Sequence, residues 1–371
     1  MKCIKSGLVY RNPKPHIKSI QAYMPSLVKY SDGEMVCTVR LGEAFQAHNL
    51  RAYVLRSKDD GNSWDMEDTL YEGTPDRPTT DNARIALDVD EKCLAAFIIR
   101  QDRKRKEMGL TNELTQGYVE QELMISKSYD RGKIWSRPRI FEPPLLGPCF
   151  EMCGSILTLS DKWLLPTSTW PDWDGNCPNG HKMVAFVSYD KGETWPEYVD
   201  VMANSREEIT FWESRIIQLK DNRLLATAWA YDRRNMCDRP NQYVISIDSG
   251  KTFSSPKSTG ILAQTLNPIT MSDGRIFSVY RRMDKPGLWA SISRIEDEQW
   301  INEEELWLWG NDPHLVSSDE NMVKNFEVLK FGFPSLVQLN DGTVFITFWG
   351  VEDCVSNVRW FKVQLQSGFI Q

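Results

Sequence analysis

Residues 57–64, which read SKDDGNSW, decide the fold because their pattern Ser-x-Asp-x-Gly-x-x-Trp recurs along the chain. The pattern returns at 128–135 (SYDRGKIW) and 188–195 (SYDKGETW), and at 246–253 (SIDSGKTF) with Phe in place of Trp. The aspartate can accept hydrogen bonds from backbone N–H groups ahead of it, and the glycine supplies the positive φ that such a turn needs. Four copies of this turn, called the eight-residue box below, indicate a repeat architecture.

Six β-hairpins accompany the boxes. Each is a pair of alternating apolar runs around Asp-Gly or a near substitute, and together they occupy residues 23–40, 83–100, 153–170, 214–230, 267–282 and 334–350. A third apolar run follows each hairpin, and in four units it leads directly into a box. In the fifth unit it leads into residues 293–300, a degenerate box that keeps the terminal Ser and Trp.

The regular cycle predicts an all-β fold, a six-bladed β-propeller of four-stranded antiparallel blades, and a single domain over residues 1–371. The sixth unit has no box, so an N-terminal strand at about residues 6–11 is expected to complete it. A pair of β-sandwiches is the alternative, but it would not repeat hairpin, strand and box so evenly. Helical periodicity is conceivable only at 297–308.

Composition excludes several classes of protein. The net charge of -7 and the pI near 5.4 argue against nucleic acid and anionic membranes as partners. The N-terminal residues have no apolar signal-peptide core and no run approaches a membrane span, which predicts a cytoplasmic protein. The eight cysteines lack the spacing of a zinc site, so we expect reduced thiols, no metal and no cofactor.

Boxes of this spelling on a six-bladed propeller resemble the sialidase (neuraminidase) superfamily, also described by its BNR or Asp-box repeats. The resemblance covers essentially the whole chain. It implies a carbohydrate-active protein with one pocket on the propeller axis. The scaffold also carries other glycosidases, lyases and binding modules, so the resemblance is more specific for the fold than for the activity.

The sialidase catalytic residues are mostly not matched. Glu213 is retained, since residues 213–222 follow the family pattern Glu-x-x-Val-Val-x-Leu-x-Asp-Gly closely. Arg281 or Arg282 could replace the third family arginine. The remaining positions differ: Tyr23 and Trp229 stand for the other two arginines, Phe333 stands for the tyrosine nucleophile, and residues 47–51 lack the expected aspartate. A sialidase mechanism is therefore disfavoured.

Three carboxylates directly precede apolar strands that should line the axis: Glu213, Glu151 and Asp81. Glycoside hydrolysis needs two carboxyl groups, one to protonate the leaving oxygen and one to attack or to activate water. These three are the candidates, with His48 as another possible proton donor because it lies near the position of the family aspartate. Each could instead form only structural ion pairs or hydrogen bonds.

The candidate substrate-binding residues are basic or aromatic. Arginines suit an anionic group of the substrate through bidentate hydrogen bonds, and a tryptophan can stack on a sugar ring or simply pack in the core. The candidates are Arg40, Arg84, Arg215, Arg281, Arg282, Trp170, His181 and Trp349.

The sequence favours an exo-acting glycoside hydrolase that removes a terminal sugar, acidic or neutral, from a glycan. One alternative is a lyase on a uronate-bearing glycan, in which His48 or Tyr280 would abstract a proton beside a carboxylate neutralised by Arg281 or Arg84. The other is a sugar-binding or protein-binding propeller without catalysis. The oligomeric state is left open.

Overall fold

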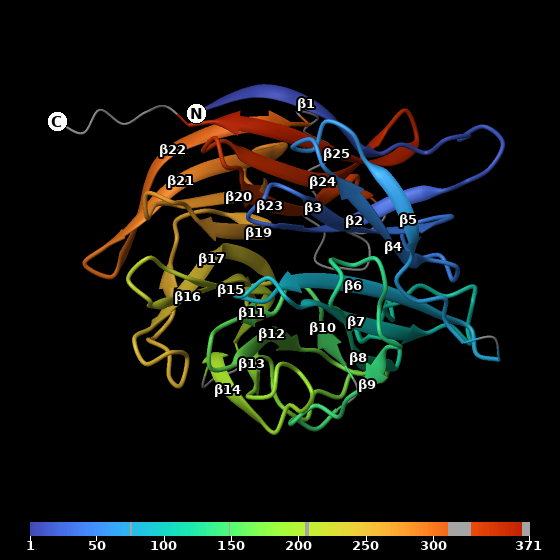
Figure 1. Cartoon of the computed structure of the whole chain (residues 1–371). Coiled ribbons are helices and arrows are strands. Elements are labelled where there is room, and N and C mark those ends of the chain that lie inside the picture. Colours follow the sequence, from blue (N-terminus) through green and yellow to red (C-terminus); the bar gives the residue numbers. More distant parts are fainter. Residues whose placement is uncertain (75, 148, 205–207, 311–327, 366–371) are drawn as a thin grey trace.

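The computed structural model describes residues 1–74, 76–147, 149–204, 208–310 and 328–365. Its elements over these residues are β-strands, which form six sheets arranged as the blades of a propeller (Figure 1). The prediction of an all-β, six-bladed β-propeller is confirmed. Over the same residues, no helix is long and apolar enough to cross a membrane.

The strands of each sheet are consecutive in the chain apart from β1, and the first strand of each blade lies innermost. The first three sheets contain β2 (Gln21–Lys29), β3 (Met35–Gly42), β4 (Arg51–Ser57) and β5 (Asp65–Thr69); β6 (Thr79–Leu87), β7 (Leu94–Asp102), β8 (Gln121–Ser128) and β9 (Arg139–Ile140); and β10 (Phe150–Glu151), β11 (Leu157–Thr158), β12 (Trp163–Thr169), β13 (Met183–Ser188) and β14 (Glu197–Met202). The last three contain β15 (Ile209–Gln218), β16 (Leu224–Asp232), β17 (Cys237–Ser246) and β18 (Lys257–Ser258); β19 (Ala263–Thr270), β20 (Ile276–Arg282), β21 (Leu288–Glu296) and β22 (Gln299–Trp309); and β23 (Phe331–Gln338), β24 (Val344–Glu352), β25 (Val355–Gln364) and β1 (Lys2–Tyr10).

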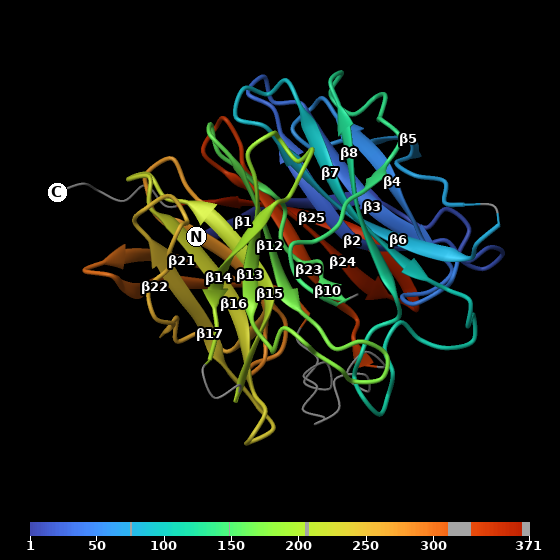
Figure 2. The same ribbon diagram turned by 90° about the horizontal axis from the view of Figure 1, so that it is seen from below.

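The two ends of the chain meet in the sixth blade. Strand β1 pairs antiparallel with β25, in a register that runs from Lys2 opposite Gln364 to Tyr10 opposite Val358. The blue N-terminal strand accordingly lies beside the red C-terminal strands in both views (Figures 1 and 2). This pairing closes the ring of blades with backbone hydrogen bonds between the first and last strands.

The eight-residue boxes connect the third and fourth strands of the first four blades, and they share one hydrogen-bond pattern. In the third blade, the Gly192 N–H donates to Ser188 Oγ at 2.7 Å, and the Thr194 N–H donates to Asp190 Oδ1 at 2.8 Å. Gly192 has a φ of 83°, which explains the glycine of the motif. The box therefore fixes the turn between the two outer strands in each of these four blades, away from the innermost strand.

The fifth blade differs from the sequence prediction. The degenerate box at 293–300 forms a tight hairpin between β21 and β22, and the helix considered for 297–308 is instead strand β22. Asp297 and Glu298 form the turn with φ values of 47° and 58°. Two central residues with positive φ are typical of the type I′ turns that match the twist of paired strands. A short turn thus replaces the box.

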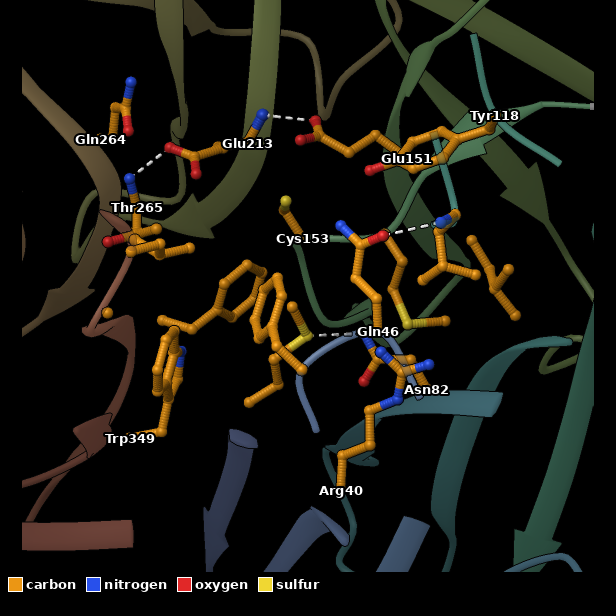
Figure 3. A pocket seen from close by; sticks show the side chains of 18 of the residues that line it. Arg40, Gln46, Asn82, Tyr118, Glu151, Cys153, Glu213, Gln264, Thr265 and Trp349 are labelled. Carbon is orange, nitrogen blue, oxygen red and sulfur yellow. Dashed lines mark hydrogen bonds between the residues drawn. The ribbon is translucent and has the colours of Figure 1, made fainter. Parts of the chain in front are cut away.

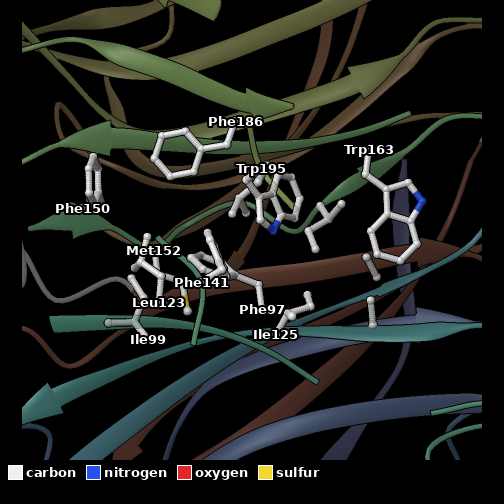
Figure 4. Packing of buried hydrophobic residues seen from close by; sticks show 14 of the residues in the cluster. Phe97, Ile99, Leu123, Ile125, Phe141, Phe150, Met152, Trp163, Phe186 and Trp195 are labelled. Carbon is white, nitrogen blue, oxygen red and sulfur yellow. The ribbon is translucent and has the colours of Figure 1, made fainter. Parts of the chain in front are cut away.

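The core lies between neighbouring blades. Figure 4 shows the cluster between the second and third blades, where Phe97 and Ile125 of one sheet pack with Phe186 and Trp195 of the next. Phe141 lies within van der Waals range of both blades and stacks at 5.5 Å on Trp195, the aromatic residue that closes the third box. The closing aromatic residue is thus packed between blades.

Candidate active site

Four of the innermost strands carry the same β-bulge near the propeller axis. The pairing register shifts between Tyr23 and Ser26, Trp212 and Arg215, Gln264 and Asn267, and Gly332 and Ser335. In each bulge, the first of the two unpaired residues has a left-handed backbone. The φ values are 52° at Met24, 55° at Glu213, 56° at Thr265 and 54° at Phe333. Because a bulge redirects side chains, all four residues line one axial cavity.

The third blade reaches the same cavity by another route. Its innermost strand is split into β10 and β11, which leaves residues 152–156 between them without strand pairing. Gly154 allows this path because a Cβ there would lie 2.7 Å from the Ser214 carbonyl oxygen of the next blade. Glu151, at the end of β10, therefore points across the blade boundary into the cavity.

Glu151 and Glu213 are neighbours in this cavity (Figure 3). The Glu151 carboxylate accepts a hydrogen bond from the backbone N–H of Glu213, and the Glu213 carboxylate accepts one from the backbone N–H of Thr265. The Glu151 carboxylate thus lies against the main chain of Glu213, and the Glu213 carboxylate lies against that of Thr265. Each is also fixed by a main-chain donor of the following blade.

The surroundings push the two carboxyl groups toward different protonation states. Burial and the nearby Glu213 carboxylate raise the pKa of Glu151 to about 8. Burial also raises the pKa of Glu213, but the hydrogen bond from Thr265 and the positive charges of Arg281 and Arg215 oppose this rise. At neutral pH Glu151 therefore holds a proton, while Arg281 and Arg215 both favour the anionic form of Glu213 and Arg215 alone opposes the rise at Glu151.

Two predicted substrate-binding arginines line the cavity, and both already donate to protein acceptors. Arg40 donates through Nη2 to Thr80 Oγ1 at 3.0 Å and to Gln101 Oε1 at 3.1 Å. Arg281 donates to the Gln264 amide oxygen and, at 3.4 Å, to the Phe331 carbonyl. Burial lowers the pKa of Arg40 to about 10. Protein acceptors thus engage part of each guanidinium, while the buried Nε of Arg40 has no partner among the described residues.

Side-chain amides supply much of the remaining polar lining. They can donate and accept, which suits sugar hydroxyl groups better than a charged group. These amides belong to Gln46, Asn82, Gln101, Gln121 and Gln264. Isolated amides carry no sequence motif, so nothing in the sequence marked Gln46, Gln101 and Gln121.

Tyr118 is another lining residue that no sequence pattern indicated. It lies in the connection between β7 and β8, and its side chain extends beside Glu151 (Figure 3). Burial and the Glu151 carboxylate both raise the pKa of Tyr118, so its phenol remains protonated. It stacks at 4.7 Å on Trp170. Only the packing of this long connection over the axis could have identified it.

Other predicted site residues lie outside the lining of this cavity. Asp81 is buried, and its Oδ1 accepts from the Ala52 N–H at 2.9 Å, which ties the first two blades together. Tyr280 is fully buried and donates to Glu305 Oε1 at 2.8 Å. Arg282 forms ion pairs with Asp284 and Glu305. His48 lies in a turn after β3 and is not among the lining residues.

The aromatic candidates line the cavity but are packed on their faces. Trp170 lies between Tyr118 and Trp212, with ring-centre distances of 4.7 and 4.9 Å. Trp349 contacts Tyr23 and Phe45 at 5.2 and 5.3 Å. Both therefore form part of an aromatic wall of the cavity. His181 lies in a neighbouring groove that shares Trp170, where burial and Arg233 lower its pKa to about 4.

Arg84 and Arg215 lie farther along the axis. Both line a second cavity formed by the innermost strands beyond the bulges, and Phe333 borders both cavities. The Arg84 guanidinium lies 4.1 Å from the centre of the Phe333 ring, and that of Arg215 lies 5.6 Å from it. These two arginines therefore line a different cavity from Arg40 and Gln46.

Comparisons by sequence found no matching protein-family model and no matching curated protein. Comparison with solved structures found close similarity of fold. A protein of unknown function from Dyadobacter fermentans is 19% identical, with a TM-score of 0.76 over 98% of this chain and 99% of that one. An α-L-arabinanase from Penicillium chrysogenum, complexed with arabinobiose, is 12% identical, with a TM-score of 0.67 over 99% of both chains.

A third similar structure is the NanB sialidase from Streptococcus pneumoniae, which is 11% identical, with a TM-score of 0.68 over 97% of this chain and 70% of that one. The chain has the sialidase-like propeller fold. The motif resemblance alone places Phe333 at the position of the sialidase tyrosine, and a phenylalanine side chain has no nucleophilic group. Trp229 donates its indole N–H to Asp238 at 2.7 Å.

Proposed function

We propose that this protein is an exo-acting glycoside hydrolase that removes a terminal neutral sugar from a glycan. The observation that carries the proposal is the Glu151 and Glu213 pair in the axial cavity. Glycosidases place two carboxyl groups roughly 5–10 Å apart on either side of the scissile bond. The hydrogen bond from the Glu213 backbone to the Glu151 carboxylate is compatible with such a separation.

The two glutamates would divide the work according to their surroundings. Glu151, which burial and Glu213 keep protonated at neutral pH, would donate a proton to the leaving oxygen as general acid. Glu213, which Arg281 and Arg215 help to keep ionised, would attack the anomeric carbon or activate water. The protonated neighbour and the main-chain N–H of Thr265 hold Glu213 in position.

The polar groups of the cavity favour a neutral sugar. A sialic acid or uronate needs cationic donors for its carboxylate, and Arg40 and Arg281 give part of their donors to Thr80, Gln101 and Gln264. The amide side chains provide donors and acceptors for hydroxyl groups. The structural similarity to an arabinanase supports a neutral substrate, whereas the similarity to sialidases does not extend to Tyr23, Trp229 and Phe333.

The shape of the site favours action at a chain end. The cavity lies on the axis, with lining residues from all six blades, and Phe333 borders it on the far side. A terminal sugar can enter such a pocket from the open face, but an internal sugar would require exits on two sides. The lyase alternative is less well supported, since Tyr280 is buried and donates to Glu305, and His48, its other expected base, does not line the cavity.

The test is hydrolysis of a panel of chromogenic glycosides with neutral and acidic terminal sugars, α-L-arabinofuranosides included. The expected result is release from a neutral glycoside by the wild type and its loss in Glu213→Gln. The matched control is Asp221→Asn, which neutralises an exposed carboxylate in a surface turn. Full activity of Glu213→Gln would contradict the proposal. Sugar binding without turnover would instead indicate a binding module, and an unsaturated ultraviolet-absorbing product would indicate a lyase.

A further inference from the structure

A second cavity with a different chemistry lies beyond Phe333, which borders both cavities. Every blade contributes residues to its lining, from the part of the innermost strand that follows the bulge or its equivalent. Most of these residues are apolar, such as Leu27, Ile85 and Ile216. Two arginines, Arg84 and Arg215, are the charged side chains of this lining. The glutamates of the first cavity are not part of it.

Arg84 is deeply buried, with 2% of its surface exposed, and Arg215 is 6% exposed. Over the described residues, neither forms a salt bridge. Arg84 donates through Nη1 to the carbonyl oxygens of Met24 and Pro25 at 3.1 and 3.2 Å, and Arg215 donates to the Ser214 carbonyl at 3.1 Å. The hydrogen bonds of these two buried cations thus go to carbonyl oxygens, and both guanidinium groups also lie over the ring of Phe333.

Charges around Arg84 do not neutralise it. Arg215 and Arg40 are the arginines close enough to act on it, and burial together with Arg215 lowers the pKa of Arg84 to about 9. The Glu151 and Glu213 carboxylates interact with Arg215 rather than with Arg84. A ring face compensates a buried cation only in part, because removing the cation from water costs more than the ring returns.

The unused edge of Arg84 indicates what would compensate it. Its Nε and Nη2 groups are buried and find no partner among the described residues. These two N–H donors lie side by side on one edge of the guanidinium, which is the arrangement that binds two oxygens of an oxyanion. A buried donor without a partner is costly, so such an edge in a native structure calls for a ligand.

We propose that the cavity beyond Phe333 binds a small inorganic oxyanion of the phosphate or sulfate type through Arg84 and Arg215. The anion would neutralise the excess positive charge on the cavity wall and so stabilise the closed ring of blades. This site is separate from the glutamate pair and does not depend on the proposed hydrolase function. Its test measures binding and stability rather than turnover.

The experiment is thermal unfolding of the wild type in increasing inorganic phosphate, with chloride used to keep the ionic strength constant. A saturable increase in Tm on the order of 2 °C is expected with phosphate. Isothermal titration calorimetry with phosphate should show one site. Arg84→Met should lose both responses, while Arg294→Met, which removes an exposed arginine paired with Glu296 and Glu303, should keep them.

Arg84→Lys guards against a variant that fails to fold. A lysine keeps the positive charge but lacks the two-donor edge, so phosphate binding should weaken at least tenfold. The proposal is overturned if the wild type shows the same Tm in phosphate and in chloride. It is also overturned if Arg84→Lys or Arg84→Met binds phosphate as tightly as the wild type.

Discussion

The outer boxes and the inner bulges of this propeller both occur four times, but the boxes have the same residue types in every copy and the bulges do not. The four boxes share residue types and hydrogen bonds, down to the Gly N–H that donates to the first Ser in every copy. The four bulges share a left-handed backbone, yet their central residues are Met24, Glu213, Thr265 and Phe333. The boxes therefore share both residue types and backbone geometry, whereas the bulges share only backbone geometry.

This difference separates stability from function. A box that keeps its residues can serve only as a turn, so every copy does the same structural work. A bulge that keeps its backbone while its side chain varies can present an acid, a hydroxyl or a ring to one cavity. Changes at the axis should therefore alter activity, whereas changes in a box should alter stability alone.

The largest effect is expected for Glu213→Gln. A glutamine can still accept from the Thr265 N–H through its amide oxygen, so the bulge should remain folded. Loss of the anionic base or nucleophile should lower kcat by about 10²–10⁴-fold on the neutral glycoside identified in the screen. Steady-state kinetics measure this, with Asp221→Asn as the control. A loss smaller than about tenfold would remove Glu213 from the mechanism.

Glu151→Gln should change how stability depends on pH. The pKa of Glu151 is raised to about 8 in the folded protein, so between pH 4.5 and 8 the folded state holds a proton that the unfolded state has released. The wild type is therefore destabilised as pH rises through this window, by on the order of a few kcal/mol. Glutamine cannot titrate, so the variant should gain stability relative to the wild type as pH rises.

Urea unfolding at pH 5 and pH 8 measures this difference. Asp81, whose pKa is raised to about 6 by burial, contributes a slope of the same sign in both proteins and cancels in the comparison. Parallel loss of stability in wild type and variant would show that Glu151 is not the buried, protonated group described here.

Arg281→Gln should lower activity less than Glu213→Gln does. Removing this positive charge should raise the pKa of Glu213, so the acidic limb of the pH–activity profile should move to higher pH. A shift of about one pKa unit is expected, which would lower activity by up to about tenfold at pH values on the acidic limb. Arg282→Gln is the matched control, since Arg282 pairs with Asp284 and Glu305 outside the cavity. Equal shifts in both variants would contradict a specific role for Arg281.

Asp190→Ala tests whether an eight-residue box affects stability alone. The change removes the acceptor for the Thr194 N–H and hydroxyl in the third box, which should cost about 1–2 kcal/mol of unfolding free energy. The value of kcat/KM for the folded protein should not change. Chemical denaturation together with kinetics checks both statements. An altered kcat/KM without a loss of stability would mean that the boxes influence the axial site.

The box turns and the blades could be predicted from the sequence, but the residues that line the axial cavity could be predicted only in part. The spacing of Asp, Gly and Trp in the boxes is local, so it fixes the turns and hence the blades. Glu151, Glu213 and Asp81 have the same local context before apolar strands, yet Asp81 lies on a regular strand and binds the Ala52 N–H instead. A bulge places Glu213 and Thr265 in the cavity lining, and no glycine in the sequence marks either position.

Contacts between distant segments account for the rest. Tyr118 enters the site because the connection between β7 and β8 folds over the axis and stacks on Trp170. The separation of Arg84 and Arg215 from Arg40 and Arg281 depends on Phe333, which borders both cavities. Such relations arise from the packing of six blades around one axis and leave no pattern within any single blade.

The most direct test of the paired glutamates is the pH dependence of kcat/KM for wild type and Glu151→Gln on one neutral aryl glycoside. The wild type should give a bell-shaped profile whose basic limb falls near pH 8, because Glu151 must be protonated to act as the acid. The basic limb should disappear in Glu151→Gln, leaving low activity that no longer falls above pH 8. A basic limb that persists unchanged in the variant would contradict the assignment of Glu151 as the proton donor.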